Sequence, residues 1–561
     1  MQNMLKLTHR GSTRALLLCS VLAVGFGAAA SAFAHDDYDR DDRDHDDRDR
    51  PVVRTVEGPV RGFKEKGVET YLGIPFAAPP VGNLRWRPPA PVKKWKDALD
   101  ATAFGPTCPQ VTTLGPFAGP ASTTEDCLYL NVFTTGNGKK KKPVIVWIYG
   151  GANSTGETND YDGSKLATGG PNGVETVVVS MNYRMGLLGF NSNPAINNEG
   201  HAWGNYGIMD QQAALRWVQR NIAYFGGDPN NVTLGGQSAG AYDTAANLLA
   251  PSSAGLFHRA IMQSYPPNSW LTAAAALTRG TNFGVAAGCP GSNAAAAACL
   301  RKLTAARILQ LQGTPNGNGP YTQQVFVDGT FIPMQPDAAW AAGAFNKMPI
   351  MTGNTKDDGN FGIGISEYFS GPPQVPQTEA QYNATVPESA RALYPLSAYN
   401  NSPSLANSAY GSDRQSCRTL HVVQTIGPQV PTYAYIFDYR NAPYHFPQMP
   451  GFIPGATHTI DIQFLFPNYH GGNLGVNIDQ VTGMPRELNA AERKLSDHLV
   501  AAWTNFAKTG NPNGTGSYPW AHSSSSTAVF YSQNVPTSQM VSQAQFVADH
   551  KCDYWYPLFG Y

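Results

Sequence analysis

Strand-like and helix-like segments alternate along most of the chain. Short apolar runs rich in β-branched residues are bounded by turn-forming residues, a pattern typical of strands that are buried on both faces. Six such runs are PVIVWIY (143–149), ETVVVSMNY (175–183), NVTLGG (231–236), HRAIMQS (258–264), PIMTGN (349–354) and TYAYIFDY (432–439). Between two of them, residues 207–226 carry apolar side chains at helical spacing. The alternation predicts an α/β fold with a parallel sheet.

The composition favours one large folded unit. The chain has 561 residues, of which 42% are hydrophobic, enough to bury a sizeable core. Charged residues make up only 14%, with 40 basic against 40 acidic, so we expect no nucleic-acid partner. No break in composition follows residue 51, and we expect a single domain over residues 51–561. The Gly/Pro/Ala-rich stretches 266–345 and 360–430 predict helices and loops that shape a substrate pocket above the sheet.

The N-terminus has the features of an export signal. Basic residues precede the apolar run ALLLCSVLAVGFGAAA, and AFA at residues 32–34 suits a signal peptidase. We predict that residues 1–34 are a signal peptide, so the mature protein is exported without stable membrane insertion; the alternative is an uncleaved anchor. Residues 35–50, HDDYDRDDRDHDDRDR, have almost no apolar content and predict a disordered leader. Its alternative interpretation is a weak metal-binding or surface-binding tail.

The cysteines favour disulfides over a metal site. The chain has 7 cysteines, and loss of Cys19 with the signal peptide leaves an even number and no CxxC pair. The remaining six are Cys108, Cys127, Cys289, Cys299, Cys417 and Cys552. An even number in an exported protein is typical of disulfide bonding, with fifteen possible pairings.

Ser238 lies in a G-x-S-x-G motif, Gly236 to Gly240, between a predicted strand and a predicted helix. A turn this tight needs glycines beside the serine, whose oxygen would be exposed above the edge of the sheet. The following helix would offer backbone donors to a developing anion. This context favours a nucleophile over the alternative, a serine that caps the helix.

A serine nucleophile needs a base, and the base needs a carboxylate that orients it. His458, in GATHTIDIQFLF, follows a glycine-containing loop and precedes an apolar segment. His445 and His470 are its competitors, in surroundings that predict exposed loops. Asp358 directly follows the strand PIMTGN, and spacing alone does not separate it from Asp357.

The oxyanion hole needs backbone N–H groups directed at the reacting carbonyl oxygen. One should come from Ala239, the residue after the nucleophile. Others should come from the glycine turn in VWIYGGAN, at Gly150, Gly151 and Ala152. The alternative is an ordinary pair of glycines between a strand and a loop.

Several longer motifs resemble those of the type-B carboxylesterases, the family that includes cholinesterases and some fungal lipases. They occur in the family's order from about residue 53 to the C-terminus: YLGIPFAAPPVGNLRWRPP, EDCLYLNVF, NYGIMDQQAALRWVQRNIAYFGGDPNNVTLGGQSAG and WTNFAKTGNPN. The resemblance implies an α/β-hydrolase fold, in which helices flank a large, mostly parallel central sheet that carries cap insertions. It also implies ester hydrolysis through an acyl-serine, with a small-molecule ester as the partner and neither a metal nor an organic cofactor.

The resemblance also implies a role for individual residues. Ser238 would be the nucleophile, His458 the base and Asp358 the acid, at a position where the family usually has glutamate. The oxyanion donors would be Gly151, Ala152 and Ala239. The methyl group of Ala152, which replaces a common glycine, would crowd the acyl pocket.

Disulfides and ion pairs follow from the same resemblance. It implies the bonds Cys108–Cys127, Cys289–Cys299 and Cys417–Cys552, and internal ion pairs of Arg85 with Glu125 and of Arg184 with Asp210. We expect the ion pairs to be structural.

Gln237 stands where cholinesterases carry a glutamate, and its neutral amide disfavours cationic substrates. We expect a hydrophobic pocket for short- to medium-chain or aryl esters. A lipase is the alternative, but residues 118–126, AGPASTTED, are short and polar for a lid. An alternative of another class is a non-catalytic binding protein, which is disfavoured because all three triad residues are present. The alanine-rich signal segment within residues 1–34 is typical of bacterial proteins. We expect export to the periplasm or the medium.

Overall fold

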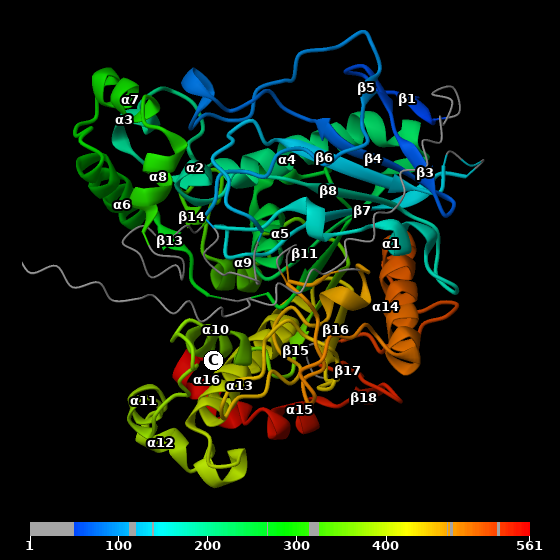
Figure 1. The fold of residues 1–561 in the computed structure, drawn as a ribbon, viewed down its shortest axis with the longest axis vertical. Coiled ribbons are helices and arrows are strands. Elements are labelled where there is room, and N and C mark those ends of the chain that lie inside the picture. Colours follow the sequence, from blue (N-terminus) through cyan, green and yellow to red (C-terminus); the bar gives the residue numbers. More distant parts are fainter. Residues whose placement is uncertain are drawn as a thin grey trace, which may run out of the picture. The chain divides into compact units, whose positions relative to one another are not determined.

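A long β-sheet carries the strands that the sequence predicts (Figure 1). The computed structural model describes residues 50–111, 119–136, 138, 140–265, 268–313, 325–467, 469–471, 475–523 and 528–561. Among them, 11 strands pair in the order β18-β17-β16-β15-β12-β11-β7-β8-β6-β4-β3. Their bounds are β3 Phe63–Glu65, β4 Val68–Pro75, β6 Tyr129–Thr134, β7 Lys142–Ile148, β8 Val177–Met181, β11 Gly227–Gln237, β12 Arg259–Gln263, β15 Ile350–Thr355, β16 Thr432–Phe437, β17 Phe530–Gln533 and β18 Gln539–Val541.

The centre of the sheet is parallel and its two ends are antiparallel. From β8 to β17 every neighbouring pair is parallel, whereas β17 pairs with β18, and β3, β4, β6 and β8 pair with one another, in antiparallel fashion. Every residue of β7, β8, β15 and β16 is buried, as expected for strands with covered faces. The prediction of a mostly parallel α/β sheet is confirmed.

The six predicted strands are β7, β8, β11, β12, β15 and β16, each within a few residues of its predicted limits. The predicted helix is α4, Tyr206–Asn221, followed by a 3₁₀ turn, Ile222–Phe225. The antiparallel strands at the two ends of the sheet are not among the predicted segments. β3 and β18 have 3 residues each, none of them buried, and β4 mixes buried with half-buried positions, so their apolar patterns are weak. In β6, which is mostly buried, the polar residues Asn131 and Thr134 interrupt the apolar run.

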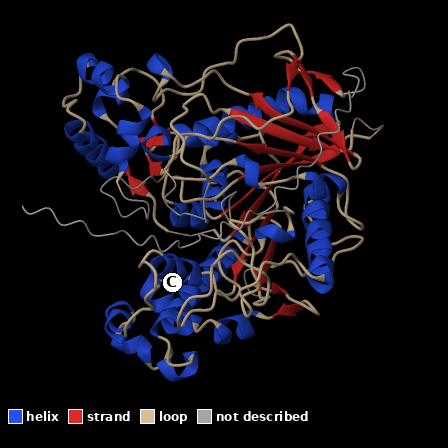
Figure 2. Cartoon of the chain, in the orientation of Figure 1, coloured by secondary structure: helices blue, strands red, loops and turns tan. Residues whose placement is uncertain are grey.

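Helices flank the sheet (Figure 2). The helix α5, Ala239–Leu249, packs on β11 and β12, and α14, Ala490–Thr509, packs on β7 and β11. The long helix α13, Pro403–Ile426, packs on β15 and β16. Together they cover the apolar strands and complete the main core.

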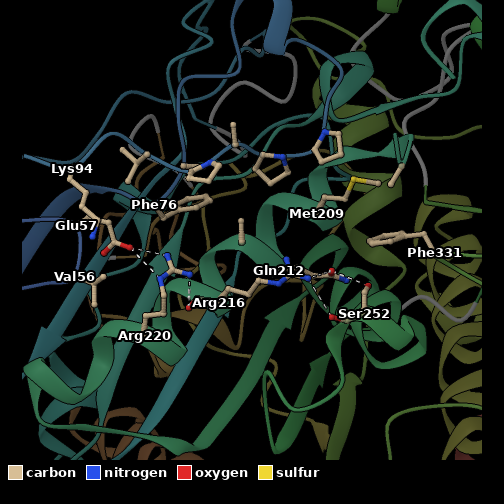
Figure 3. A pocket seen from close by; sticks show the side chains of 18 residues that line it. Val56, Glu57, Phe76, Lys94, Met209, Gln212, Arg216, Arg220, Ser252 and Phe331 are labelled. Carbon is tan, nitrogen blue, oxygen red and sulfur yellow. Dashed lines mark hydrogen bonds and ion pairs between the residues drawn. The ribbon is translucent and has the colours of Figure 1, made fainter. Parts of the chain in front are cut away.

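The helix α4 presents two different faces. Its inner face is buried and contacts α5 and β11, and it carries Asp210 and Gln211. Its outer face carries Ala213, Arg216 and Arg220 and borders a groove on the surface (Figure 3). The helix therefore joins the interior of the protein to a surface cavity.

The two stretches expected above the sheet are largely helical. The first holds α6 Ala273–Ala286, α7 Ala294–Arg301, α8 Ala305–Gln312 and α9 Pro336–Ala342, and the second holds α10 Asn360–Tyr368, α11 Glu379–Thr385, α12 Glu388–Arg391 and all of α13. Helices α6 to α8 contribute to a separate apolar cluster around Trp86 and Phe283.

Three disulfides lie within the described residues. They join Cys108 to Cys127, Cys289 to Cys299 and Cys417 to Cys552, the pairs that the resemblance implies. The last joins α13 to α16, Cys552–Phe559, across 135 residues of sequence. Such a bond stabilises the fold mainly by restricting the unfolded chain, typically by about 2–4 kcal/mol.

Residues Arg50–Tyr561 form one compact unit. Within the described residues, none of the helices combines the length and the apolar character needed to span a membrane. The predicted signal peptide and all of the predicted leader except Arg50 lie outside the described residues.

Both expected ion pairs are present and largely buried. The guanidinium of Arg184 donates to both oxygens of Asp210, at 2.8 and 2.7 Å, and Asp210 is fully buried. Arg85 donates from Nε to Glu125 at 2.7 Å and also to two carbonyl groups that follow α7 or end it. Each guanidinium joins segments that are distant in sequence.

We expect Asp210→Asn to lower the free energy of unfolding by about 3–5 kcal/mol, because it leaves a buried guanidinium without its counter-charge. Glu65→Gln is the matched control, since Glu65 pairs with Lys66 at 3.5 Å in solvent. Its expected change is within about 0.5 kcal/mol. Urea denaturation of both variants measures the difference, and equal stabilities would contradict a structural role for the buried pair.

Candidate active site

Ser238 lies at the turn where β11 ends and α5 begins. Its backbone has φ 58° and ψ −121°, a region that residues other than glycine rarely occupy. Its side chain caps none of the described backbone N–H groups of the helix. The alternative interpretation as a helix-capping serine is therefore wrong, and the strained backbone is the kind that persists at functional sites.

Two glycines make this turn possible. A Cβ atom on Gly240 would lie 2.0 Å from the carbonyl oxygen of Ile148, at the end of β7. A Cβ atom on Gly236 would lie 2.5 Å from the backbone of Gly240. The expectation that side chains would collide on both sides of Ser238 is therefore confirmed.

His458 and Asp358 are in direct contact. The Nδ1 atom of His458 lies 3.0 Å from Oδ1 of Asp358, which follows β15. The other oxygen of Asp358 accepts hydrogen bonds from Ser264 at 2.7 Å and from Thr355 at 3.0 Å. Neither Ser264 nor Thr355 is among the predicted site residues, although each ends or follows a predicted parallel strand, where such groups converge.

The charged forms of His458 and Asp358 stabilise each other. Burial opposes ionisation of Asp358, but the charge and the hydrogen bond of His458, with those of Ser264 and Thr355, outweigh it and hold the pKa of Asp358 below its usual range. Burial likewise opposes protonation of His458, but the charge of Asp358, its hydrogen bond and the charge of Asp461 raise the pKa of His458 above 6.5.

The competing histidines lie in other surroundings. The prediction that His445 lies in an exposed loop is wrong: it is buried, 5% exposed, and packs on the Tyr444 ring at 4.0 Å between centroids. Burial, together with the charge of His470, lowers the pKa of His445 to about 3. His470 is half-buried, and neither lines the cavity that contains Ser238.

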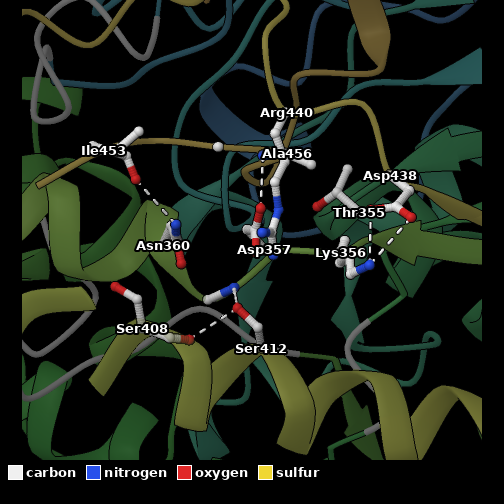
Figure 4. A network of polar contacts seen from close by, with 12 residues as sticks. Thr355, Lys356, Asp357, Asn360, Ser408, Ser412, Asp438, Arg440, Ile453 and Ala456 are labelled. Atoms are coloured by element: carbon white, nitrogen blue, oxygen red, sulfur yellow. Dashed lines mark hydrogen bonds and ion pairs between the residues drawn. The ribbon is translucent and has the colours of Figure 1, made fainter. Parts of the chain in front are cut away.

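Asp357 contacts Arg440 and Ala456 (Figure 4), whereas its neighbour Asp358 contacts His458. One oxygen of Asp357 accepts from the backbone N–H of Ala456 at 2.9 Å, and the other accepts from Arg440 at 2.7 Å. The backbone N–H of Asp357 donates to the carbonyl of Ala456 at 2.9 Å. Asp357 thus joins the loop of the acid to the loop that carries His458.

The turn after β7 has three consecutive residues with positive φ: Gly151 at 108°, Ala152 at 55° and Asn153 at 54°. A Cβ atom on Gly151 would lie 2.1 Å from the carbonyl oxygen of Thr155, so this position requires glycine. Ala152 adopts a left-handed conformation that is unfavourable for a side chain with Cβ. The turn must therefore be held by contacts elsewhere.

Asn153 supplies those contacts. Its Nδ2 donates to Asp243 of α5 at 2.9 Å, and its Oδ1 accepts from the hydroxyl of Tyr183 at 3.2 Å. Asp243 is fully buried and also accepts from Gln211 of α4 at 2.6 Å. Burial raises the pKa of Asp243 to about 7, against the hydrogen bonds of Asn153 and Gln211. The network links α4 and α5 to the turn at residues 151–153, and no local sequence pattern reveals it.

One cavity of about 270 Å³ brings the candidate residues together. Ser238, His458, Gly151 and Ala152 line it, and Ala239 follows Ser238 as the first residue of α5. The remaining lining residues are mostly aromatic or small: Gly150, Thr155, Gly156, Asp160, Tyr161, Gln237, Phe361, Thr459, Tyr469 and Gly471. An apolar cavity with a few convergent polar groups suits a small organic ligand.

Gln237 contacts the free nitrogen of the imidazole. Its Nε2 lies 3.2 Å from Nε2 of His458. Because Nδ1 of a neutral His458 donates to Asp358, Nε2 carries the lone pair and accepts from this amide. The contact is thus consistent with the tautomer that a general base requires.

A second carboxylate, that of the buried Asp461, acts on the imidazole of His458 through its charge. Asp461 is 2% exposed and accepts from Nε2 of Gln263 at 3.0 Å, while Oε1 of Gln263 accepts from Trp503 at 3.0 Å. Burial raises the pKa of Asp461 to about 6. Asp461 is absent from the predicted site, although it lies three residues after His458 in the printed sequence.

A comparison with known proteins identifies the family of this chain. The sequence matches the carboxylesterase family over residues 49–555. The chain belongs to the carboxylesterase family. It is a carboxylic ester hydrolase with the α/β-hydrolase fold, and its substrates are small-molecule esters.

Individual relatives are similar in sequence to this chain over most of their length. A para-nitrobenzyl esterase of Bacillus subtilis (strain 168) is 34% identical, over 82% of this carboxylesterase and 90% of the relative. A fumonisin B1 esterase of Sphingopyxis macrogoltabida is 35% identical, over 82% of both chains. A solved PNB esterase structure has a TM-score of 0.72 and 30% identity, covering 89% of this chain and 99% of that one.

The raised pKa of His458 predicts where activity falls in acid. The base must be neutral, so kcat/KM of the carboxylesterase should fall as the pH drops through a value above 6.5. Asp461→Asn removes one negative charge that raises this pKa, and the acid limb should move to lower pH. The measurement is kcat/KM for a soluble ester between about pH 5 and 9.

Asp553→Asn is the control, because Asp553 is exposed on α16 and its profile should match that of the unmodified protein. An acid limb that stays in place or rises in Asp461→Asn would contradict the electrostatic coupling.

The contacts of Asp357 with Ala456 and Arg440 predict that this side chain positions the loop of His458 for catalysis. In Asp357→Asn an amide NH₂ must face either Arg440 or the Ala456 N–H, which loosens the loop of His458. We expect kcat to fall by about tenfold to a hundredfold with little change in KM. Lys356→Gln is the control, since Lys356 pairs with Asp438 at 3.0 Å. Equal kcat values for the two variants would contradict this role of Asp357.

Proposed function

We propose that this carboxylesterase hydrolyses short- to medium-chain or aryl esters by two successive acyl transfers at Ser238. The observation that carries the proposal is the single cavity lined by Ser238 and His458, whose Nδ1 lies 3.0 Å from Asp358. The strained turn at Ser238, which is half-buried and lines the cavity, supports the assignment of the nucleophile.

In the first step, Oγ of Ser238 attacks the ester carbonyl carbon while Nε2 of His458 takes its proton. Asp358 holds the imidazole in the required tautomer and stabilises the imidazolium. The backbone N–H groups of Gly151, Ala152 and Ala239 bind the oxyanion. The alcohol then leaves with the proton from His458.

Water repeats the sequence in the second step. His458 takes a proton from water as the water oxygen attacks the acyl-serine carbonyl. The tetrahedral intermediate collapses, Oγ of Ser238 regains a proton from His458, and the carboxylic acid leaves. Chain residues alone supply every proton transfer.

The cavity supports the substrate class. Its volume of about 270 Å³ and the rings of Tyr161, Phe361 and Tyr469 suit a modest acyl chain or an aromatic group. Gln237 presents a neutral amide, which does not favour a cationic alcohol. The name of the para-nitrobenzyl esterase points to an aryl-type substrate for that relative and supports the same class here.

The alternatives receive less support. Residues 119–126, the described part of the segment considered as a lid, are polar, and Ser122 pairs with Gln110 by backbone hydrogen bonds. A lipase that works through a mobile hydrophobic lid is therefore disfavoured. A non-catalytic binding protein does not fit membership of a family of ester hydrolases.

We further propose that the chain is exported, with residues 1–34 as a signal peptide, 35–50 as a leader and 51–561 as a single carboxylesterase domain. The three disulfides support an oxidising compartment, either the periplasm or the medium.

The central test is Ser238→Ala. Loss of the nucleophile should lower kcat for a chromogenic aryl ester by a factor on the order of 10⁵ and abolish labelling by a fluorophosphonate. Ser389→Ala, an exposed serine, should retain both properties. Ester hydrolysis or labelling that survives in Ser238→Ala would overturn the assignment, and denaturation of both variants shows whether the fold is intact.

A further inference from the structure

A groove of about 560 Å³ lies between the outer face of α4 and residues 88–92 (Figure 3). The described residues that line it include none of those that line the cavity of Ser238. Its volume is within the range of sites that bind small molecules. The ester-hydrolysis mechanism makes no use of it.

One wall of the groove is apolar. It includes Phe76 and three prolines, Pro88, Pro89 and Pro91, which have no backbone N–H to offer a ligand. The backbone N–H of Ala78 donates to the carbonyl of Ala90 at 2.8 Å, which holds this segment in place. Such a wall favours contact with a hydrocarbon chain.

The two ends of the groove differ. Lys94, Glu57 and Arg220 lie toward one end, and Met209 and Phe331 lie toward the other (Figure 3). An extended ligand with a polar head and an apolar tail would match this arrangement in one direction.

The charged end has an excess of cations. Arg220 and Lys94 line it together with the carboxylate of Glu57, and Arg216 lies next along the groove, where its guanidinium reaches Gln212 and Ser252 (Figure 3). Glu57 accepts from Arg220 at 2.9 Å and from Asn221 at 2.8 Å, so its oxygens are already engaged. The remaining excess favours an anionic head group.

Arg216 is the cation that an anion would meet. It donates to neutral oxygens only weakly, to Gln212 at 3.3 Å and to the Ser252 carbonyl at 3.5 Å. Among the described residues, no carboxylate forms an ion pair with Arg216. Burial lowers the pKa of Arg216, as does the neighbouring charge of Arg220. Arg216 is exposed, and a guanidinium that no described carboxylate pairs with favours a carboxylate that can accept two hydrogen bonds.

We propose that this groove binds a free medium-chain carboxylate, with its head group at Arg216 and its alkyl chain along the prolines toward Met209 and Phe331. The site is separate from the catalytic cavity, and the proposal does not depend on the roles assigned to Ser238, Asp358 and His458. A carboxylate of this kind is also the acid that ester hydrolysis releases, so the groove would bind a product of the protein's own reaction class.

The test is calorimetric titration of the Ser238→Ala protein with decanoate below its micelle concentration. We expect saturable binding that weakens at least about tenfold when Arg216→Gln is added. Decylammonium, of equal chain length and opposite charge, should not bind the groove. Arg307→Gln is the matched control, because Arg307 is exposed on α8 and donates to Gln310 at 2.6 Å. It should bind decanoate normally.

A second variant guards against a folding defect in Arg216→Gln. Ala213 lines the groove on α4, and Ala213→Leu fills it without removing charge. Decanoate should also bind this variant more weakly, while the free energy of unfolding measured in urea stays close to that of the parent protein. Absence of saturable binding, or equal affinity in both groove variants and the control, overturns the proposal.

Flotation with lipid vesicles distinguishes a free carboxylate from a membrane lipid as the ligand of the groove. The protein should not float with phosphatidylglycerol vesicles. Flotation that Arg216→Gln abolishes would assign the cations to a lipid head group and overturn the proposal of a free carboxylate. The readouts are binding alone, so failure here leaves the test of Ser238 by fluorophosphonate unaffected.

Discussion

The close approach of β7, β11 and α5 is the constraint on which the candidate site depends. Gly240 lies so near the carbonyl of Ile148 that a single added carbon would collide with it. This contact forces the chain to turn from strand to helix at Ser238, in a backbone conformation that costs on the order of 1–3 kcal/mol. The surrounding buried strands supply the stability that maintains it.

Each functional element is held by a polar contact to a distant segment. Asp358 is oriented by Ser264 and Thr355, and Asp357 holds the loop of His458 through Ala456. Asn153 holds the turn after β7, where the oxyanion donors are proposed, through Asp243. Because these groups are buried, their hydrogen bonds act in a low dielectric and an unpaired member would be costly. The site is therefore rigid because its supporting groups are satisfied.

The helix α4 connects these features to the surface. On its inner face Asp210 pairs with Arg184, and Gln211 supports Asp243. On its outer face Arg216 and Arg220 border the proline-lined groove. A single helix thus contributes a buried ion pair, a support for the turn after β7 and the charged wall of a second cavity. A ligand in the groove would contact the same helix that supports this turn.

The sequence by itself determined the features that depend on local pattern. Buried strands show as apolar runs and α4 shows as a helical period, because burial of a repeating backbone imposes a repeating sequence. The turn at Ser238 is equally local, since its glycines are neighbours of the serine. The short edge strands β3 and β18 were not predicted, because none of their residues is buried and the sequence therefore shows little apolar pattern there.

Residue spacing left Asp357 and Asp358 open and the family resemblance pointed to Asp358, but only the tertiary structure brings Asp358 to His458 and decides which residues support the site. Asn153 and Asp243 are 90 residues apart, His458 and Asp358 are 100 apart, and Gln263 and Asp461 are 198 apart. His445, expected in an exposed loop, is buried among aromatic rings for the same reason. Contacts between such distant residues arise from the packing of strands and loops in space, and no spacing along the chain encodes them.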